Sequence, residues 1–364
     1  MKMYEKELVA LKRAGRLRER RLFDEHLIDM ASNDYLGLSQ KPKQLKKAMK
    51  LLLTYQTLSP KASMLVNGYH PIHQTFERYM AELQGFEEGI VVGSGFLANL
   101  GLIDALVRKG DRLFMDESYH ASGVMATESM RERVVFFAHN DVEDLKEKLA
   151  RYGGKRQIVA VEGVYSMGGD LCKREIFELC EKRGVLMIVD EAHSAGVLGE
   201  SFLGIFDHYG ITPTPHHIKM GTLGKAYGAY GAYILSSKHI ATFLLNRAKP
   251  LIYATAPSLF DTALALVNVQ YIQKHLVRYR KKRERFYDLV QKHLGLKIES
   301  LILPLEVVTN EATQKEQKRW LKRGYLIGAI RQPTVSRPIL RIILNLGLST
   351  KEVTTLLKQL KRKG

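Results

Sequence analysis

The sequence predicts an α/β protein with a large domain built on a mostly parallel, doubly wound sheet and a smaller α+β domain at the C-terminus. Between residues 90 and 225, short apolar runs alternate with helical patterns, as in parallel sheets covered by helices. After residue 236 this alternation gives way to a long helical stretch, 259–292, and then to a mixed pattern of strands and helices. A chain of 364 residues with 45% hydrophobic content can form one large core and a second, smaller one.

The chain is expected to divide into three parts. Residues 1–40 form an N-terminal helix and a connecting segment, 41–240 the large domain, and 241–364 the C-terminal domain with the bridging helix 259–292. In the first part, 1–29 has a basic amphipathic pattern, and 30–39 reads as a tight turn with polar turn residues between apolar ones.

The large domain begins with a helical pattern at 41–56 and a loop at 59–73, and the sequence HPIHQTFERYMAELQGF then returns to helical spacing that ends near Gly85. Strands are expected at the starts of 90–107, 111–123 and 156–170 and at 185–190, with further helices at 141–152 and up to about 183. A helix from about 237 leads to the bridging stretch. In the C-terminal domain we expect strands near 302–308 and 339–345 and helices near 311–323 and 350–362.

The net charge of +18, from 56 basic and 38 acidic residues, is the unusual bulk property. The basic residues are spread along helical patterns, which favours solvated helix faces over a nucleic-acid interface, and no nucleic-acid-reading motif is found. A basic surface could also attract an acidic substrate carrier, either coenzyme A or a carrier protein. No apolar run approaches the length of a membrane span, and the two cysteines fit no zinc site or disulfide framework. These features predict a cytoplasmic protein without a metal or a membrane partner.

Two segments carry the chemistry: VLMIVDEAHSAG at 185–196 and GTLGKAYGAYGAY at 221–233. The first reads as a buried strand that delivers Asp190 and His193 to its carboxyl end. The second places Lys225 among glycines, which leave its amine accessible to a ligand. An acid at a strand end and a lysine in a glycine-rich turn are what pyridoxal phosphate requires, because the lysine forms a Schiff base and the acid holds the pyridine nitrogen protonated.

Other polar or small residues also fall where predicted strands end. Ligands of doubly wound sheets bind beyond the carboxyl ends of the strands. The amides at Gly93 to Phe96 open a helix and suit a phosphate group, although glycine also permits plain close packing. The residues that converge on this edge are Gly95, His120, Glu162, Asp190, His193 and Lys225.

A late loop, GAIRQPTVSRPILR at 328–341, holds three arginines around two prolines. An arginine beside a proline-fixed loop can bind both oxygens of a carboxylate with its planar fork. We expect Arg331 to do so, whereas Arg337 is equally well explained as a surface residue.

Seven motifs together resemble the α-oxoamine synthases, pyridoxal phosphate enzymes of the aspartate aminotransferase fold (fold type I). They are NDYLGLS, GSGF, the HAS of YHASG, EGVYSM, VDEAHSAGVLGE, TLGK and IRQPTV, in an order and spacing that agree from about residue 30 to 345. The resemblance implies a mostly parallel seven-stranded sheet in the large domain. It departs from the family at Gly168, where members often have Asp, and at 59–68, which lacks the usual glycine-rich sequence.

The resemblance also assigns roles. Lys225 would carry the cofactor, Asp190 would pair with its pyridine nitrogen, His193 would bond its phenolic oxygen, and His120 would stack on its ring. The phosphate would be held by Gly95, Phe96 and Thr222, and by Thr255 of a neighbouring subunit in a homodimer. Glu162 and Ser166 would line the cofactor site, and Asn33, Arg331 and Thr334 the substrate site.

The implied reaction is a decarboxylative condensation of L-alanine with a pimeloyl thioester, carried by coenzyme A or by a carrier protein. Glycine-using synthases of the same family and an aminotransferase of the same fold are the alternatives, since a fold does not fix the chemistry it performs.

Overall fold

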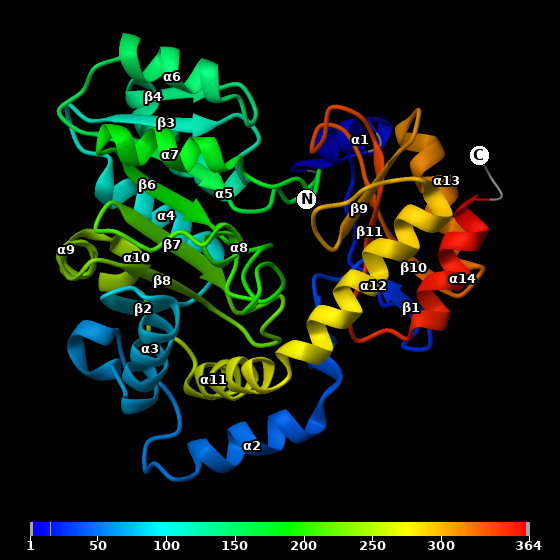
Figure 1. The fold of residues 1–364 in the computed structure, drawn as a ribbon, viewed down its shortest axis with the longest axis horizontal. Helices are drawn as coiled ribbons and strands as arrows, with labels where there is room; N and C mark the ends of the chain where they lie inside the picture. Colours follow the sequence, from blue (N-terminus) through cyan, green and yellow to red (C-terminus); the bar gives the residue numbers. More distant parts are fainter. Residues whose placement is uncertain (1–2, 15, 362–364) are drawn as a thin grey trace.

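The computed structural model describes residues 3–14 and 16–361, and within them the chain forms two sheets (Figure 1). The larger sheet has seven strands in the order β2-β8-β7-β6-β5-β3-β4, and the smaller has four in the order β1-β10-β11-β9. In Figure 1 the large sheet and its helices occupy the left of the molecule, the small sheet lies on the right, and α11 and α12 run between them.

The seven-stranded sheet is parallel from β7 through β6, β5 and β3 to β4, whereas β8 runs antiparallel to both of its neighbours. The predicted mostly parallel, seven-stranded α/β sheet is therefore confirmed. Its strands are β2 (Glu88–Val92), β3 (Arg112–Asp116), β4 (Val134–Phe137), β5 (Gln157–Glu162), β6 (Leu186–Asp190), β7 (His217–Thr222) and β8 (Ala232–Ser236).

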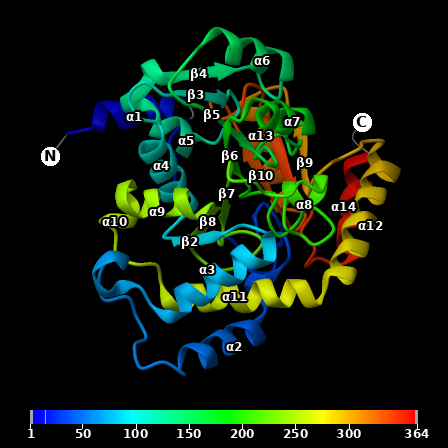
Figure 2. The same cartoon turned by 60° about the vertical axis from the view of Figure 1, so that its left-hand side comes forward.

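Helices cover both faces of this sheet, and neighbouring residues of one strand enter different cores. Val91 packs with one hydrophobic cluster, whereas Ile90 and Val92 pack with the other, as the alternation of side chains along a strand requires. Figure 2 shows the helices on the two sides of the sheet. The helices of the large domain are α2 (Pro42–Leu52), α3 (Pro71–Gln84), α4 (Gly95–Leu106), α5 (Ala121–Ala126), α6 (Val142–Arg151), α7 (Arg174–Arg183), α8 (Ile205–Tyr209), α9 (Lys238–Arg247) and α10 (Lys249–Ile252).

The bridge between the domains is two helices, α11 (Leu259–Lys274) and α12 (Leu276–Leu294), so the expectation of one continuous helix over 259–292 was wrong. The chain leaves helical geometry at His275, where φ is −124° and ψ is 18°. The His275 ring Nδ1 lies 2.7 Å from the carbonyl oxygen of Tyr271, one turn earlier. After the bend the packing partners change, since α11 packs on α2 and α3 whereas α12 packs on α14.

The small sheet is built mainly from the C-terminal part of the chain, but one strand comes from the N-terminal segment. β1 (Ile28–Met30) pairs in parallel with β10 (Tyr325–Ile330), and β11 (Ile339–Ile343) lies antiparallel between β10 and β9 (Ile302–Glu306). Neither β1 nor β10 was predicted. The helices here are α13 (Asn310–Leu321), which packs on β10, and α14 (Thr350–Lys361), which packs on α12.

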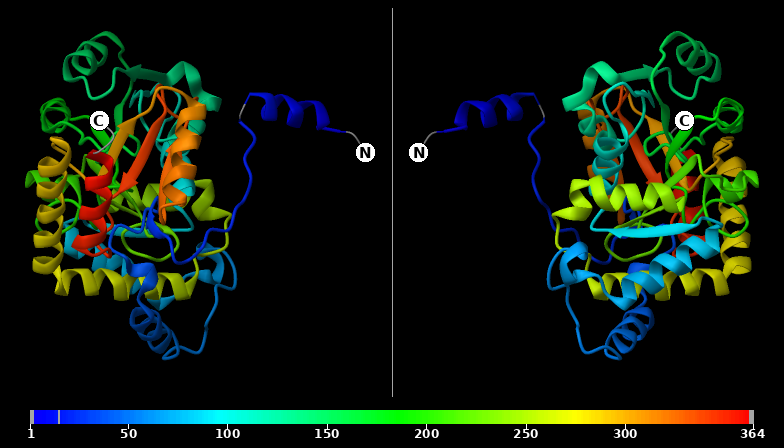
Figure 3. Two further views of the ribbon diagram at one scale, coloured as in Figure 1. Left: turned by 90° about the vertical axis from the view of Figure 1, so that its right-hand side faces the viewer. Right: turned by 90° about the vertical axis from the view of Figure 1, so that its left-hand side faces the viewer.

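The N-terminal helix α1 (Glu5–Arg13) is shorter than the helix predicted within 1–29 and contributes no buried residue. Figure 3 shows it standing away from the body of the molecule at the end of an extended segment. None of the helices in the described ranges is both long and apolar enough to cross a bilayer.

Candidate active site

A small cavity of about 180 Å³ lies at the carboxyl ends of the central strands and gathers side chains from five segments of the large domain. It is lined by eight of the residues that the sequence predicted, together with four others, Asn99, Ser122, Ala192 and Met220. The eight are Gly95, Phe96, His120, Glu162, Asp190, His193, Thr222 and Lys225. Parallel strands bring these distant positions together because their carboxyl ends meet at one edge of the sheet.

Asp190 ends β6, and both of its carboxylate oxygens are held. One oxygen accepts a hydrogen bond from the Ala192 amide at 2.9 Å, and the other accepts one from Asn99 Nδ2 at 2.8 Å. Asn99 is fixed in turn, because its Oδ1 accepts from the Tyr119 hydroxyl at 2.8 Å. The carboxylate is buried and oriented, which suits it to bind a protonated ring nitrogen from a ligand in the cavity.

Lys225 follows β7, and its Nζ lies 2.7 Å from His193 Nε2. Burial lowers the pKa of the Lys225 amine to about 8, although the carboxylates of Asp190 and Glu162 oppose the shift. Burial also lowers the pKa of His193 well below its usual value, and the positive charge of Lys225 adds to this effect. A neutral His193 can therefore accept a hydrogen bond from the ammonium of Lys225, and an amine with a lowered pKa is readily converted to a nucleophile or base.

Tyr35, which was not among the predicted site residues, completes this row of polar groups. Its hydroxyl lies 2.6 Å from Nδ1 of His193, on the side of the ring opposite Lys225. Burial raises the pKa of Tyr35 to about 12, so the phenol keeps its proton. The partner of Nδ1 determines which ring nitrogen of a histidine carries hydrogen, so Tyr35 fixes how His193 meets the cavity.

Glu162 ends β5 beside Asp190 and is buried. One of its oxygens accepts from the amide of Ser166 at 3.1 Å, whereas the other has no hydrogen-bond partner among the described residues. Burial, with the nearby charge of Asp190, raises the pKa of Glu162 well above its usual range. A protonated Glu162 could donate a hydrogen bond to a ligand in the cavity.

The opposite side of the cavity combines a helix N-terminus with small and aromatic residues. α4 begins at Gly95, and Thr222 lies against it, since a methyl group added at Gly95 would be 3.7 Å from the Thr222 Cβ. The free amides at the start of this 12-residue helix suit a phosphate group. His120 is exposed at the mouth, with Nδ1 2.8 Å from the Ser122 hydroxyl.

Arg341, on β11, is the arginine that the tertiary structure brings to this site. Its Nε donates to the Ser166 carbonyl at 2.7 Å, and its Nη1 donates to Asn33 Oδ1 at 3.1 Å. Only 6% of the residue is exposed, and its Nη2 makes no hydrogen bond that meets distance and angle criteria among the described residues, although the guanidinium lies close enough to the Tyr35 hydroxyl to oppose the rise in its pKa. Its charge helps to lower the pKa values of Lys225 and His193, so the guanidinium lies close to both of these cavity residues although it does not itself line the cavity. A buried nitrogen without a partner is costly, which points to an anionic ligand at Nη2.

Five predicted residues do not line the cavity. Asn33 and Ser166 lie just behind it as the two partners of Arg341. Arg331 and Thr334 lie on the loop after β10, where the Thr334 amide donates to the Arg331 carbonyl at 3.0 Å. Thr255 is exposed and forms an isolated β-bridge with Ser63.

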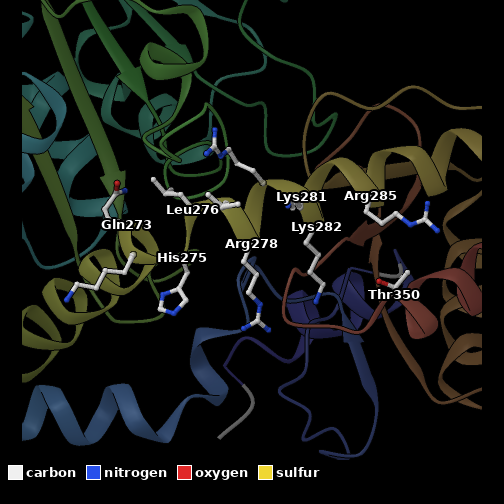
Figure 4. A pocket seen from close by; sticks show the side chains of 11 residues that line it. Gln273, His275, Leu276, Arg278, Lys281, Lys282, Arg285 and Thr350 are labelled. Atoms are coloured by element: carbon white, nitrogen blue, oxygen red, sulfur yellow. The ribbon is translucent and has the colours of Figure 1, made fainter.

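A larger groove of about 870 Å³ lies along α12 and is lined mainly by cations, including Arg278, Lys281, Lys282 and Arg285. Figure 4 shows these side chains projecting from the helix. No carboxylate lines this groove in the described part of the chain, so the acid and amine pair needed for the predicted chemistry is found in the smaller cavity. In the described part of the chain, no group of three or more His, Cys, Asp or Glu side chains is arranged to hold a metal ion.

Comparison with known proteins gives a consistent result. The family described as "Aminotransferase class I and II" matches residues 25–360. An 8-amino-7-oxononanoate synthase of Helicobacter pylori strain J99 is 43% identical, over 97% of this chain and 95% of the relative. A putative 8-amino-7-oxononanoate synthase of Aquifex aeolicus is 35% identical, over 96% of this chain and 94% of the relative.

Solved structures share the fold at lower sequence identity. A serine palmitoyltransferase from S. paucimobilis superposes with a TM-score of 0.87 at 23% identity, covering 100% of this chain and 98% of that one. An 8-amino-7-oxononanoate synthase from Francisella tularensis gives a TM-score of 0.76 at 24% identity, covering 93% of this chain and 98% of that one.

Proposed function

The chain belongs to the class I and II aminotransferase family, and on this premise we propose that it catalyses the 8-amino-7-oxononanoate synthase reaction of biotin biosynthesis. In this reaction L-alanine and a pimeloyl thioester give the 8-amino-7-oxo acid, carbon dioxide and a free thiol. Similarity along nearly the whole chain to synthases of that name supports the choice of reaction. The observation that carries the proposal is that Lys225 and Asp190 line one buried cavity and that the charge of the buried Arg341 is close enough to lower the pKa of Lys225.

The cavity residues fit pyridoxal phosphate, the cofactor of this enzyme. Lys225 has the amine that reacts with the cofactor aldehyde, and Asp190, oriented by Asn99, would hold the ring nitrogen. The amides at the start of α4 and the hydroxyl of Thr222 would hold the phosphate, and His120 at the mouth would cover the ring. When bound, the cofactor supplies an electron sink that stabilises a carbanion at the amino-acid Cα.

We propose that Arg341 binds the carboxylate of the amino acid through Nη2. Nε and Nη1 are already engaged by Ser166 and Asn33, so the guanidinium is held in place before the substrate arrives. The prediction that Arg331 and Thr334 bind the substrate remains a prediction. Both residues lie on the loop between β10 and β11, the strand that carries Arg341.

In this proposal Lys225 also moves the proton. Once alanine occupies the site, the Nζ of Lys225 is free to remove the Cα proton, and an amine with a pKa of about 8 is well matched to that task near neutral pH. The Cα then forms a bond to the carbonyl carbon of the thioester, and the thiol leaves. The carboxylate held by Arg341 departs as carbon dioxide, and a proton from Lys225 replaces it at Cα.

We further propose that the enzyme is a homodimer with Thr255 reaching the neighbouring subunit's cofactor phosphate. Thr255 is exposed and does not line the cavity of its own chain. Helix α1 also suits a second copy, because its apolar residues Leu8, Val9 and Leu11 are all exposed. Sedimentation of the active enzyme tests this proposal, and a fully active monomer at assay concentration would refute it.

A cytoplasmic location is proposed as well. The two cysteines, Cys172 and Cys180, are buried free thiols, which suits a reducing compartment.

The deciding experiment is a comparison of steady-state rates with alanine and glycine against pimeloyl, acetyl and succinyl thioesters. The highest kcat/KM is expected for alanine with pimeloyl thioester, and coenzyme A and carrier-protein thioesters can be compared in the same assay. A preference for glycine would instead support a glycine-using synthase of the family, and amino transfer without carbon dioxide release would support an aminotransferase. The Lys225→Ala variant serves as the control and is expected to lose both turnover and the absorbance of covalently bound cofactor.

A further inference from the structure

Three strand ends next to the active site hold a histidine between two carboxylates. His139, in the connection after β4, places Nδ1 3.0 Å from Asp116 Oδ1 and Nε2 3.0 Å from Asp170 Oδ2. Asp116 ends β3 and is fully buried, whereas Asp170 belongs to the loop after β5. The ring of His139 therefore ties this loop to the neighbouring strand of the sheet.

The surroundings of the cluster hold the histidine in its charged form. The hydrogen bonds to Asp116 and Asp170, the first being the larger effect, raise the pKa of His139 to about 10. Near neutral pH both ring nitrogens therefore carry hydrogen and donate. The Tyr165 hydroxyl donates to the other oxygen of Asp116 at 2.7 Å, and its ring stands edge-on to His139 at 4.3 Å between centroids. The amide of Asn140 also donates to Asp116, at 2.8 Å.

The loop held in this way is 163–171, which here is named the arginine-support loop. Its two ends form an isolated β-bridge, Val164 with Leu171, and the Tyr165 amide donates to the Asp170 carbonyl at 2.9 Å. Gly168 leaves the space that Asp170 uses, since a methyl group at 168 would lie 2.4 Å from Asp170 Oδ1. An acidic side chain at 168 would also repel Asp170, so the unusual glycine and the His139 contact are compatible with each other.

The arginine-support loop contacts the C-terminal domain at two points. The Ser166 carbonyl accepts from Arg341 Nε at 2.7 Å, and the Gly169 carbonyl accepts from the Ser300 hydroxyl at 2.6 Å. On its other side, the Ser166 amide donates to Glu162, which lines the cavity. A displacement of the loop would therefore move the guanidinium of Arg341 relative to Lys225.

We propose that His139 is a positioning residue that sets the affinity for the amino-acid carboxylate, because it fixes the arginine-support loop that holds Arg341. The identity of that substrate rests on the proposed function, but the role of His139 applies to whichever amino acid the enzyme binds. His139 contacts neither the cavity nor the residues expected to hold the cofactor. Cofactor binding should therefore be preserved when it is replaced.

The test variant is His139→Gln, which removes the positive charge. It is compared with His139→Arg, which keeps a cation able to reach two carboxylates. The matched control is His239→Gln, because His239 is an exposed histidine on α9. Amino-acid affinity is measured from the change in absorbance of the bound cofactor on titration, and steady-state rates are measured in parallel. His139→Gln is expected to raise the amino-acid Kd and KM about tenfold, with kcat and cofactor affinity within about threefold of wild type. His139→Arg should recover part of the loss, and His239→Gln should change nothing.

An unchanged amino-acid Kd in a folded His139→Gln variant would overturn the proposal, as would an equal loss of kcat and cofactor affinity. If that variant does not fold, Asp170→Asn provides the same test, because it weakens the contacts of the loop with His139 and Asn140 without changing Asp116, and it should also raise the amino-acid Kd. Because the titration needs no turnover, an enzyme that prefers glycine would contradict the proposed function without affecting this result.

Discussion

Replacing Arg341 by lysine tests the arrangement of the substrate site most directly. The guanidinium donates to Ser166 and Asn33 and leaves Nη2 available for the substrate carboxylate, whereas a lysine has a single nitrogen for all three tasks. Loss of a charge-assisted hydrogen bond costs about 1.5–3 kcal/mol, and each 1.4 kcal/mol or so corresponds to a tenfold change in rate. We therefore expect kcat/KM for the amino acid to fall about 10- to 150-fold, mostly through KM.

The assay follows carbon dioxide release or thiol release while the amino-acid concentration is varied, and absorbance confirms that the cofactor is bound. Arg331→Lys is the matched comparison, because Arg331 lies on the loop after β10 and is less buried than Arg341. A change of less than about twofold in Arg341→Lys, together with a large loss in Arg331→Lys, would refute the reasoning from the buried guanidinium and support the prediction made from sequence.

Three further predictions concern ionisation and hydrogen bonding. The rate at which cofactor attaches to the cofactor-free protein should rise with pH and level off above about 8, because burial lowers the pKa of Lys225 to about 8 and only the neutral amine reacts. A rate in stopped-flow absorbance that kept rising until the pH reached the usual lysine pKa of 10.5 would contradict this. Tyr35→Phe should reduce kcat about tenfold by leaving the buried Nδ1 of His193 unpaired, and steady-state kinetics with unchanged activity would contradict this. The pKa of His139 is raised from 6.5 to about 10, so its stabilisation is complete below about pH 6.5 and is lost as pH rises through 10. The difference in Tm between wild type and His139→Gln, measured by calorimetry, should therefore shrink from pH 7 to 10, and a constant difference would contradict the role of the charge.

The sequence was sufficient for the elements whose patterns are local. The helix α3 ends where Gly85 adopts φ 72°, as expected of a glycine that terminates a helix, and β6 delivers Asp190 to its carboxyl end. Both features depend on the conformation of adjacent residues. The weaker elements were missed because they are stabilised by partners elsewhere: β1 is three residues long and exists through its pairing with β10.

For the site, the sequence alone determined which chemical groups gather at the carboxyl edge of the sheet, because strand order and strand polarity are sufficient to bring Lys225, Asp190 and His193 together. It could not determine which arginine is buried beside them, since Arg331 and Arg341 lie in one short segment of the sequence. Only the packing of β11 against the arginine-support loop decided that Arg341 is buried with one nitrogen unpartnered. The same holds for two further contacts. Tyr35 contacts His193, 158 positions away, and His139 contacts Asp170, 31 positions away, and a local sequence pattern cannot predict either contact.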